Sequence, residues 1–380
     1  PKQAEPAPEP MKALQDAILG KSRAAVDLVI GLIGATAFFL GLMKVAEEGG
    51  MLTVIARVIR PLMVRLFPGV PADHPAMAAM VLNLAANALG LGNAATPLGL
   101  KAMAELDRLN RHKGTATDAM VQFLAINTSS VTLLPTGVIV LRETLGSRHP
   151  ADILPTTLFA TLCSTTVAIL ACRLLVRVVP TAEQITPAEE VSDLPDDAQA
   201  TEAQDAAPPW VSALALGTLV AAIPLSVVYG KVIAPWIIPS LTLGMLTFGH
   251  LRGVPVYEAF VRGAKEGWDI AVRIIPYLVA ILVAVGMLQA SGALDTAVSL
   301  LDPLTSPLGL PGAALPMALI RPLSGSGATG VLVGTLTNPA TGPDTYTGFL
   351  VSTISGSTET TFYVLAVYFG SVGIRRARHA

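Results

Sequence analysis

The chain has 380 residues, of which 52% are hydrophobic and 14% charged, and its formal net charge at pH 7 is −2. Its mean hydropathy is +0.61. This balance is typical of a polytopic membrane protein and argues against a soluble enzyme, and the weak net charge gives no reason to expect a nucleic-acid partner. We therefore expect an all-α, polytopic integral membrane protein whose main partner is the lipid bilayer.

Apolar runs long enough to cross a bilayer as helices recur along the chain. They cover residues 26–46, 75–100, 119–141, 153–179, 210–229, 232–251, 270–290, 313–336 and 349–374. Several hold Pro, Gly, Ser or Asn in mid-run, which predicts broken or re-entrant helices. Residues 51–67 and 293–308 instead have the pattern of amphipathic helices at the membrane surface, with Arg57, Arg60 and Arg65 on the polar face of the first.

An acidic segment divides the chain. Residues 181–207 carry many Asp and Glu residues but no Lys or Arg. Such a composition cannot bury enough apolar surface to fold, so we expect a disordered linker at residues 180–209. The predicted organisation is an N-terminal tail and lead-in at 1–23, a first membrane half at 24–179, the linker, and a second membrane half at 210–380.

The two halves share a pattern. Residues 27–62 match residues 269–304 without a gap, and Gly50 corresponds to Gly292. In each half a polar, glycine-rich run follows (83–97 and 321–330), and then a hydroxyl-rich apolar run (123–132 and 349–361). Internal duplication with the site at the repeat interface is the common architecture of secondary transporters. Whether the repeats are parallel or inverted stays open.

The polar runs predict a solute site. Irregular, polar backbone at membrane depth is tolerated only where it is buried in protein or lines a cavity. The candidate substrate-binding residues are Asn83, Asn87, Asn93, Thr96, Asn127, Thr128, Ser129, Arg321, Ser324, Ser326, Ser355, Ser357, Thr358 and Glu359. The alternative for the amides and hydroxyls is hydrogen bonding between packed helices, without a ligand.

Two charged residues stand out among the candidates. A carboxylate in an apolar stretch is costly, so Glu359 indicates a functional group that binds a cation, a proton or a polar solute. Arg321 precedes a glycine-rich helix start and could hold an anion there. The alternative is a structural ion pair between Arg321 and Glu359.

We expect no cofactor, no metal and no enzymatic activity. The histidines lie in predicted loops and tails, and no Cys/His cluster occurs. Residues 325–330 are formally GxGxxG, but no βαβ unit surrounds them. A hydrolase would need a base beside Ser324 or Ser326, and Glu359 is the only candidate nearby.

The motifs resemble a known family. Residues 89–103 and 127–132 resemble spore maturation protein A, and residues 321–327 and 356–370, with the Arg-rich tail, resemble spore maturation protein B. The resemblance covers nearly everything except the tail and the acidic linker, so the chain resembles a natural fusion of the two. A-type proteins begin with a further apolar segment, which this sequence does not show before Met11.

The resemblance implies a membrane domain of the nucleoside recognition, or Gate, type in each half, in the cytoplasmic membrane of a bacterium. Together with the residue pattern it predicts binding and translocation of a small polar or anionic solute, nucleoside-like solutes included, linked to a proton or cation. The alternative is an envelope protein that handles lipid or cell-wall precursors, or scaffolds partners, without solute transport. The solute, the coupling ion, the direction and any homo-oligomer stay open.

Overall fold

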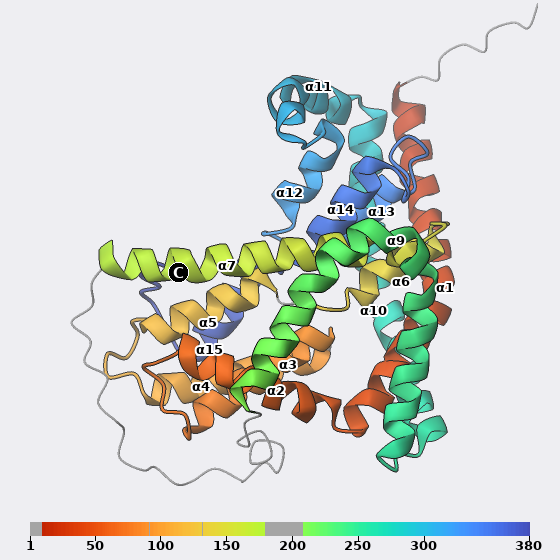
Figure 1. Ribbon diagram of the computed structural model, residues 1–380. Coiled ribbons are helices and arrows are strands. Elements are labelled where there is room, and N and C mark those ends of the chain that lie inside the picture. The colour runs from red at the N-terminus through yellow and green to blue at the C-terminus, as the bar shows by residue number, and fades with distance from the viewer. Residues whose placement is uncertain (1–9, 91, 131, 179–207) are drawn as a thin grey trace, which may run out of the picture.

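The computed structural model describes residues 10–90, 92–130, 132–178 and 208–380, and in these residues it is helical without a β-strand (Figure 1). The elements are α1 (Pro10–Glu48), α2 (Met51–Leu66), α3 (Pro75–Leu89), α4 (Gly92–Arg108), α5 (Asp118–Ser129), α6 (Thr136–Thr144), η1 (Pro150–Ile153), α7 (Leu154–Val178), α9 (Pro209–Leu251), α10 (Val256–Ala290), α11 (Ala293–Thr305), η2 (Ser306–Leu308), η3 (Gly312–Ala314), α12 (Leu315–Ile320), α13 (Gly325–Leu336), α14 (Tyr346–Ser357) and α15 (Thr361–Ser371). The all-α prediction is confirmed for these residues.

The predicted breaks in the apolar runs are present. Gly90 has a φ of 75°, a left-handed conformation that ends α3 before α4 begins. Ser130 has a φ of 49°, and the chain restarts as α6 only after Pro135. In the second half the breaks lie between α12 and α13 and between α14 and α15. The two runs expected at 210–229 and 232–251 instead form the single helix α9, an arch in Figure 1 with Pro224, Pro235 and Pro239 inside it.

The helices that carry the matching segments, α1 and α10, pack side by side and run antiparallel (Figure 1). Lys44 near the end of α1 lies 3.7 Å from Glu266 near the start of α10. At Gly267 an added Cβ would lie 2.8 Å from Cα of Ala37, so glycine permits the close approach of the two helices. The two matching segments therefore run in opposite directions where α1 and α10 meet.

A glycine makes the same turn after each of these helices. Gly50 precedes α2 with a φ of 80°, and Gly292 precedes α11 with a φ of 71°. Both values lie in the left-handed region that glycine adopts at no steric cost. The hydroxyl-rich helices also match, since Thr117 caps α5 and Thr345 caps α14, each by accepting a hydrogen bond from the backbone N–H three residues on.

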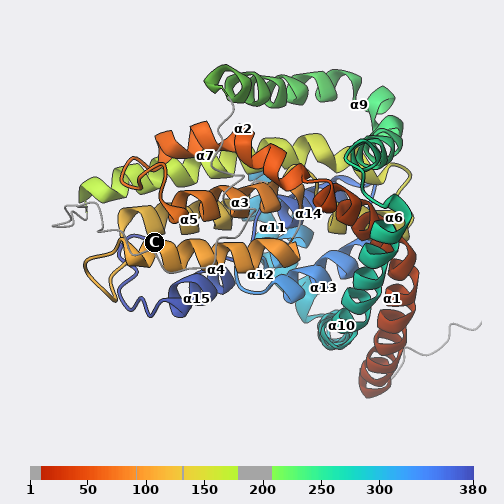
Figure 2. The ribbon, with the colours of Figure 1, turned by 90° about the horizontal axis from the view of Figure 1, so that it is seen from below.

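The two halves exchange helices. The core around α2 to α5 includes Tyr368 and Phe369 of α15, from the second half. The core around α12 to α14 includes Ile139 and Leu141 of α6, from the first half. Figure 2 shows α15 beside α4, with α6 at the other end of the molecule. The segments that join α5 to α6 and α14 to α15 therefore cross between the two cores.

The predicted surface helices at 51–67 and 293–308 are helical, but α2 does not leave all of its arginines in solvent. Arg60 is buried, donates to the carbonyl of Ala72 at 2.9 Å and lies 3.6 Å from Asp73. The loop after α2 folds back over it, so a helical wheel alone misplaces this side chain.

By length and composition, Pro150–Val178 is long and apolar enough to span a membrane, with a mean hydropathy of 1.9 over its most apolar window. Ser299–Leu308 and Gly312–Ile320 would together make one more span, bent by 99°. In the part of the chain that the structure describes, no further helix meets both criteria.

Candidate functional site

A cavity of about 410 Å³ lies where the broken helices meet. Its lining comes from both halves: residues of α1, the end of α3, the segment between α5 and α6, α6 itself, and the breaks of the second half. The lining residues are Thr36, Phe39, Leu40, Asn87, Gly90, Ser130, Thr132, Leu134, Pro135, Thr136, Gly137, Val138, Val140, Leu141, Arg321, Thr329, Ser355, Gly356 and Glu359. Of the sequence-predicted residues, the structure brings Asn87, Arg321, Ser355 and Glu359 together here.

Backbone hydrogen bonds fix the helix breaks of the second half, and one of these bonds reaches the first half. The N–H of Glu359, between α14 and α15, donates to the carbonyl of Thr128 in α5 at 2.9 Å. The N–H of Phe362 donates to the carbonyl of Pro322, between α12 and α13, at 3.1 Å. Interrupted helices leave backbone groups unpaired, and these contacts satisfy some of them away from water. These hydrogen bonds stabilise the irregular backbone beside the cavity.

Arg321 and Glu359 are the charged residues of the lining. Nη2 of Arg321 donates to the carbonyl of Thr358 and lies 3.8 Å from Oε2 of Glu359. The Arg321 side chain is 13% exposed, and its buried Nε–H has no hydrogen-bond partner in the described structure. The Glu359 side chain is 48% exposed, so the carboxylate faces open space rather than a packed core. The pair is too long for the short, charge-assisted contact that a structural salt bridge usually makes.

Asn87 is held by a second amide. Its Nδ2 donates to Oδ1 of Asn127 at 2.9 Å, and Nδ2 of Asn127 donates to the carbonyl of Phe123 at 2.9 Å. Asn127 is buried behind the lining, where Oδ1 also accepts from the hydroxyl of Tyr368 at 3.5 Å. Asn127 therefore positions Asn87 and does not face the cavity itself, while the amide oxygen of Asn87 stays available as an acceptor.

Asn83 lies one turn before Asn87 but points elsewhere. It is fully buried, and its Nδ2 donates to the carbonyl of Ala95 at 2.7 Å and to the hydroxyl of Tyr368 at 3.4 Å. It therefore joins α3 to α4 and α15, as the alternative of interhelical hydrogen bonding anticipates. Thr96, on α4, is half-buried and lies outside the lining. The side chain of Asn93 lies outside the described residues.

The remaining predicted residues are not part of the cavity lining. Ser129 is buried and donates to the carbonyl of Ile126 at 3.0 Å. Ser324 caps α13 by accepting from the N–H of Gly327 at 3.0 Å, and Ser326 beside it is exposed. Ser357 is buried at the end of α14. Thr128 and Thr358 contribute the backbone carbonyls that accept from Glu359 and Arg321, respectively.

Several lining hydroxyls were missing from the candidate residues predicted from sequence: Thr36, Ser130, Thr136 and Thr329. Ser130 lies in the predicted hydroxyl-rich run and Thr329 in the glycine-rich run, so the motifs themselves contained that signal. Thr36 is a lone hydroxyl in an apolar helix, where no local pattern marks it.

Among the described residues, no group of three or more His, Cys, Asp or Glu side chains lies together as a metal site would require. The chemistry that this lining offers is recognition: one guanidinium, one carboxylate, one amide and a ring of hydroxyls, set against an apolar wall of Phe39, Leu40, Val138, Val140 and Leu141.

These features define the class of protein. The chain belongs to the Gate family, whose description is nucleoside recognition and whose model matches residues 29–174 and 271–375. Spore maturation protein A of Bacillus subtilis is 44% identical over 154 residues, which are 40% of this chain and 79% of that protein. Spore maturation protein B of the same organism is 49% identical over 139 residues, which are 37% of this chain and 77% of that protein. The predicted resemblance to a fusion of the two is thus confirmed. No solved structure matches this chain.

Proposed function

We propose that this chain is a multi-pass protein of the bacterial cytoplasmic membrane that binds a small polar solute in the cavity between its halves and moves it across the bilayer. The observation that carries the proposal is the position of the cavity. It lies where broken helices of both halves meet, and it holds Arg321, Glu359 and Asn87 against an apolar wall. Sites of secondary transporters are built in this way, and about 300–1,000 Å³ is the usual volume of a small-molecule site.

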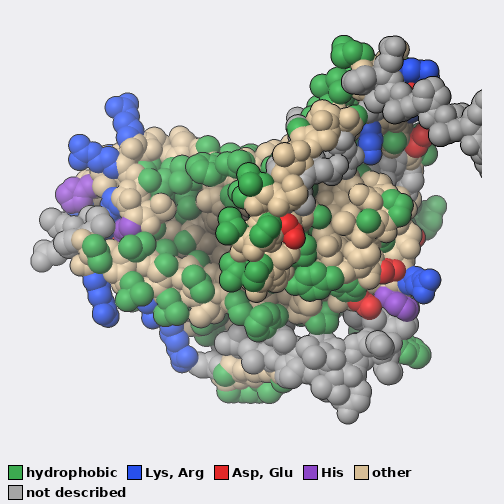
Figure 3. All heavy atoms as spheres, turned by 90° about the horizontal axis from the view of Figure 1, so that it is seen from above, with side chains coloured by type: hydrophobic (Ala, Val, Ile, Leu, Met, Phe, Trp, Pro, Cys, Tyr) green, Lys and Arg blue, Asp and Glu red, His purple; other side chains and the backbone are tan. Residues whose placement is uncertain are grey.

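The surface supports the membrane part of the proposal. Phe159, Val167 and Leu174 on α7 are each more than half exposed. On the face shown in Figure 3, Lys and Arg side chains lie around the margin, and mostly hydrophobic and uncharged side chains fill the middle. An apolar surface of this kind is covered by lipid or by a partner in a stable protein.

The exposed carboxylate supports coupling to a proton or a cation. An ionisable group inside a membrane protein is expensive to maintain and marks a solute or ion pathway by default. Glu359 lies in the cavity at a helix break, where protonation or ion binding would change its attraction to Arg321. The proposal requires no cofactor and no catalytic step.

Thermal unfolding of the detergent-purified chain against a solute panel tests the binding step. The panel holds nucleosides, bases, organic acids, phosphates, amino acids and divalent cations. A ligand present at 100 times its Kd should stabilise the protein by about 2.7 kcal/mol. That shift should become clearly smaller in Glu359→Gln and Asn87→Ala and persist in full in Glu143→Gln, whose side chain is exposed on α6 outside the cavity.

Asn83→Ala provides a matched contrast to Asn87→Ala. Because Asn83 bonds to α4 and α15 rather than facing the cavity, its loss should lower the unfolding temperature and leave ligand affinity unchanged. A confirmed ligand would then be tested for uptake into proteoliposomes. Stabilisation by lipid but by no solute of the panel would reject the solute site and favour the lipid-handling alternative.

A further inference from the structure

The charges in the cavity cancel. Arg321 contributes one positive charge and Glu359 one negative charge, and every other lining residue is neutral. A purely anionic solute beside Arg321 would meet the carboxylate of Glu359, and a purely cationic one would meet the guanidinium. Because the effective dielectric constant inside a protein is lower than in water, such a like-charge contact is costly. The lining therefore selects against solutes that carry charge of one sign only.

Both charged groups also have unused hydrogen-bonding capacity. The buried Nε–H of Arg321 has no partner in the described structure, and Nη2 of Arg321 lies 3.8 Å from the Glu359 carboxylate, beyond hydrogen-bond distance. A buried donor without a partner costs free energy until a ligand or water satisfies it. At 3.8 Å the two groups are near enough for one small molecule to contact both, and they do not saturate each other.

The rest of the lining indicates the chemical character of the uncharged part of the solute. The lining also includes the apolar side chains of Phe39, Leu40, Val138, Val140 and Leu141. The hydroxyls and the amide of Asn87 can bind either end of a polar head group. The site thus combines a closely spaced pair of opposite charges, Arg321 and Glu359, with apolar side chains.

We propose that the solute is a small zwitterion of the α-amino-acid type, with its carboxylate against Arg321, its ammonium group against Glu359 and an apolar side chain along α1 and α6. In an α-amino acid a single carbon separates the charged groups, which suits two protein charges held this close together. This substrate class concerns the same cavity and depends on the proposed solute site.

Equilibrium binding to the detergent-purified full chain tests the proposal, with L-leucine as the probe. N-acetyl-L-leucine keeps only the negative charge, and L-leucine amide keeps only the positive one. 6-Aminohexanoate is an isomer of leucine with its charges far apart. Loss of one charged hydrogen-bond partner should weaken binding about 10- to 100-fold, so all three compounds should bind at least about tenfold more weakly than L-leucine. Uridine and adenosine complete the panel.

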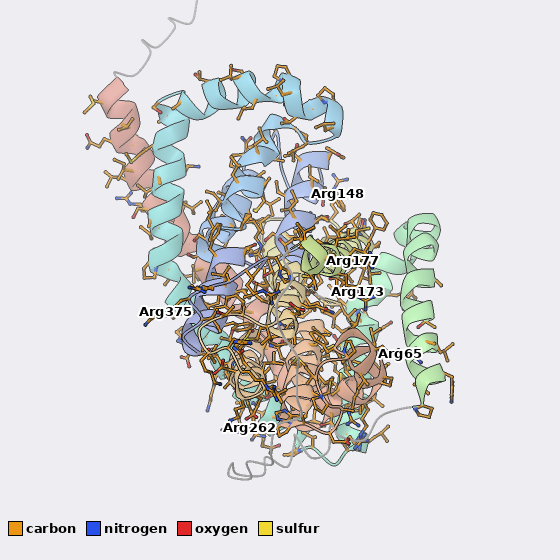
Figure 4. The ribbon with its side chains drawn as sticks, turned by 90° about the vertical axis from the view of Figure 1, so that its left-hand side faces the viewer. Arg65, Arg148, Arg173, Arg177, Arg262 and Arg375 are labelled. Carbon is orange, nitrogen blue, oxygen red and sulfur yellow. The ribbon has the colours of Figure 1, made fainter. Side chains whose placement is uncertain are left out.

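A variant that changes which ligand charge is preferred shows that the residue acts in binding and not only in folding. In Glu359→Gln the repulsion of anions is gone, so N-acetyl-L-leucine should gain affinity while L-leucine loses it. A purely structural role for Glu359 predicts no such reversal. Arg321→Gln should lose affinity for L-leucine. The controls Glu143→Gln and Arg173→Gln should bind L-leucine with unchanged affinity. Arg173 lies exposed on α7, outside the lining (Figure 4).

The outcomes distinguish the zwitterion proposal from the more general proposal of a solute site. Preference for L-leucine over its blocked and extended relatives, with the reversal in Glu359→Gln, supports the zwitterion. Binding of uridine or adenosine in the same cavity, with no response to L-leucine, overturns the zwitterion and leaves the solute site standing. Absence of binding by every compound of both panels overturns the solute site and the zwitterion together.

Discussion

Nη2 of Arg142, in α6 of the first half, lies 3.4 Å from Oδ1 of Asp344, just before α14 of the second half. Arg142 is fully buried, and its guanidinium also donates to the carbonyls of Pro150 at 3.2 Å and Pro343 at 2.6 Å. It lies 4.4 Å from the centre of the Phe349 ring as well. The exchanged helix α6 is therefore fixed to the second half by the contacts of one buried cation with Pro343, Asp344 and Phe349.

Arg142→Ala should destabilise the protein strongly, by about 3 kcal/mol, because it removes these bonds, empties a fully buried position and leaves partly buried carbonyls without a donor. Unfolding in detergent followed by circular dichroism measures the loss. Arg177→Ala, at an exposed position on α7 (Figure 4), should change stability by no more than about 0.5 kcal/mol. Equal effects of the two variants would contradict the proposed role of Arg142 in holding α6 to the second half.

A reciprocal contact fixes α15 to the first half. Nη1 of Arg378 lies 2.7 Å from Oδ1 of Asp118, the first residue of α5, and the N–H of Ala116 donates to the carbonyl of Arg376 at 2.9 Å. We therefore predict that residues 1–179 and 208–380, expressed together as separate chains, co-purify. Affinity purification of one tagged piece, with quantification of the other, measures this.

Two phenylalanines of α15 provide the control for that experiment. Phe369 is 3% exposed in the first-half core, and Phe362 on the same helix is 59% exposed. Phe369→Ser should weaken the association by about 3 kcal/mol or more, because it leaves a cavity and buries a hydroxyl. Phe362→Ser should leave most of the association intact. Independent, non-associating halves would contradict the exchange.

The antiparallel packing of α1 and α10 depends on glycine. An added Cβ at Gly267 would lie 2.8 Å from Cα and 2.9 Å from N of Ala37, both backbone atoms that cannot move aside cheaply. Gly267→Ala should therefore destabilise the protein by about 1–3 kcal/mol, as overpacking does. At Gly244 in α9 nothing lies within 4 Å of the added atom, so Gly244→Ala should be neutral or stabilising by up to about 1 kcal/mol. The same detergent unfolding assay compares them.

Asp344 gives the stability a dependence on pH. Burial alone would raise its pKa, but hydrogen bonds from the N–H of Arg148 and the hydroxyl of Ser147, with the nearby arginine charges, hold the pKa below the ordinary value of 3.8. The unfolded state therefore binds the proton more tightly. The contribution of Asp344 is complete above the ordinary value and is lost as the pH falls through the lower folded pKa.

The unfolding temperature measured against pH checks this. The stability difference between the native chain and Asp344→Asn should shrink as the pH falls below the ordinary Asp range. Asp16→Asn, at an exposed position in α1, should show no such convergence. A constant difference across the whole range would show that the Asp344 charge does not stabilise the fold.

Much of the local structure follows from the sequence. The apolar runs predicted helices, and mid-run Gly, Pro and Ser residues predicted breaks that the structure places at Gly90, Ser130 and Pro135. These features depend on backbone preferences of a few neighbouring residues, which a single sequence displays. The two polar runs likewise led to Asn87 and Arg321, and the hydroxyl-rich run at 349–361 led to Ser355 and Glu359. The structure places these four residues around one cavity.

Tertiary structure decided what local preference leaves undetermined. Asn83 and Asn87 share a helix face by spacing, yet one bonds to α4 and α15 and the other lines the cavity, because different helices cover successive turns. The second-half partners of Arg142, Pro343 and Asp344, lie about two hundred residues away, and no local pattern signals a pairing at that separation. Three further features arise only when distant segments pack: the direction of α10 against α1, the exchange of α6 and α15, and the balanced charges of the cavity. Each depends on which apolar faces bury one another.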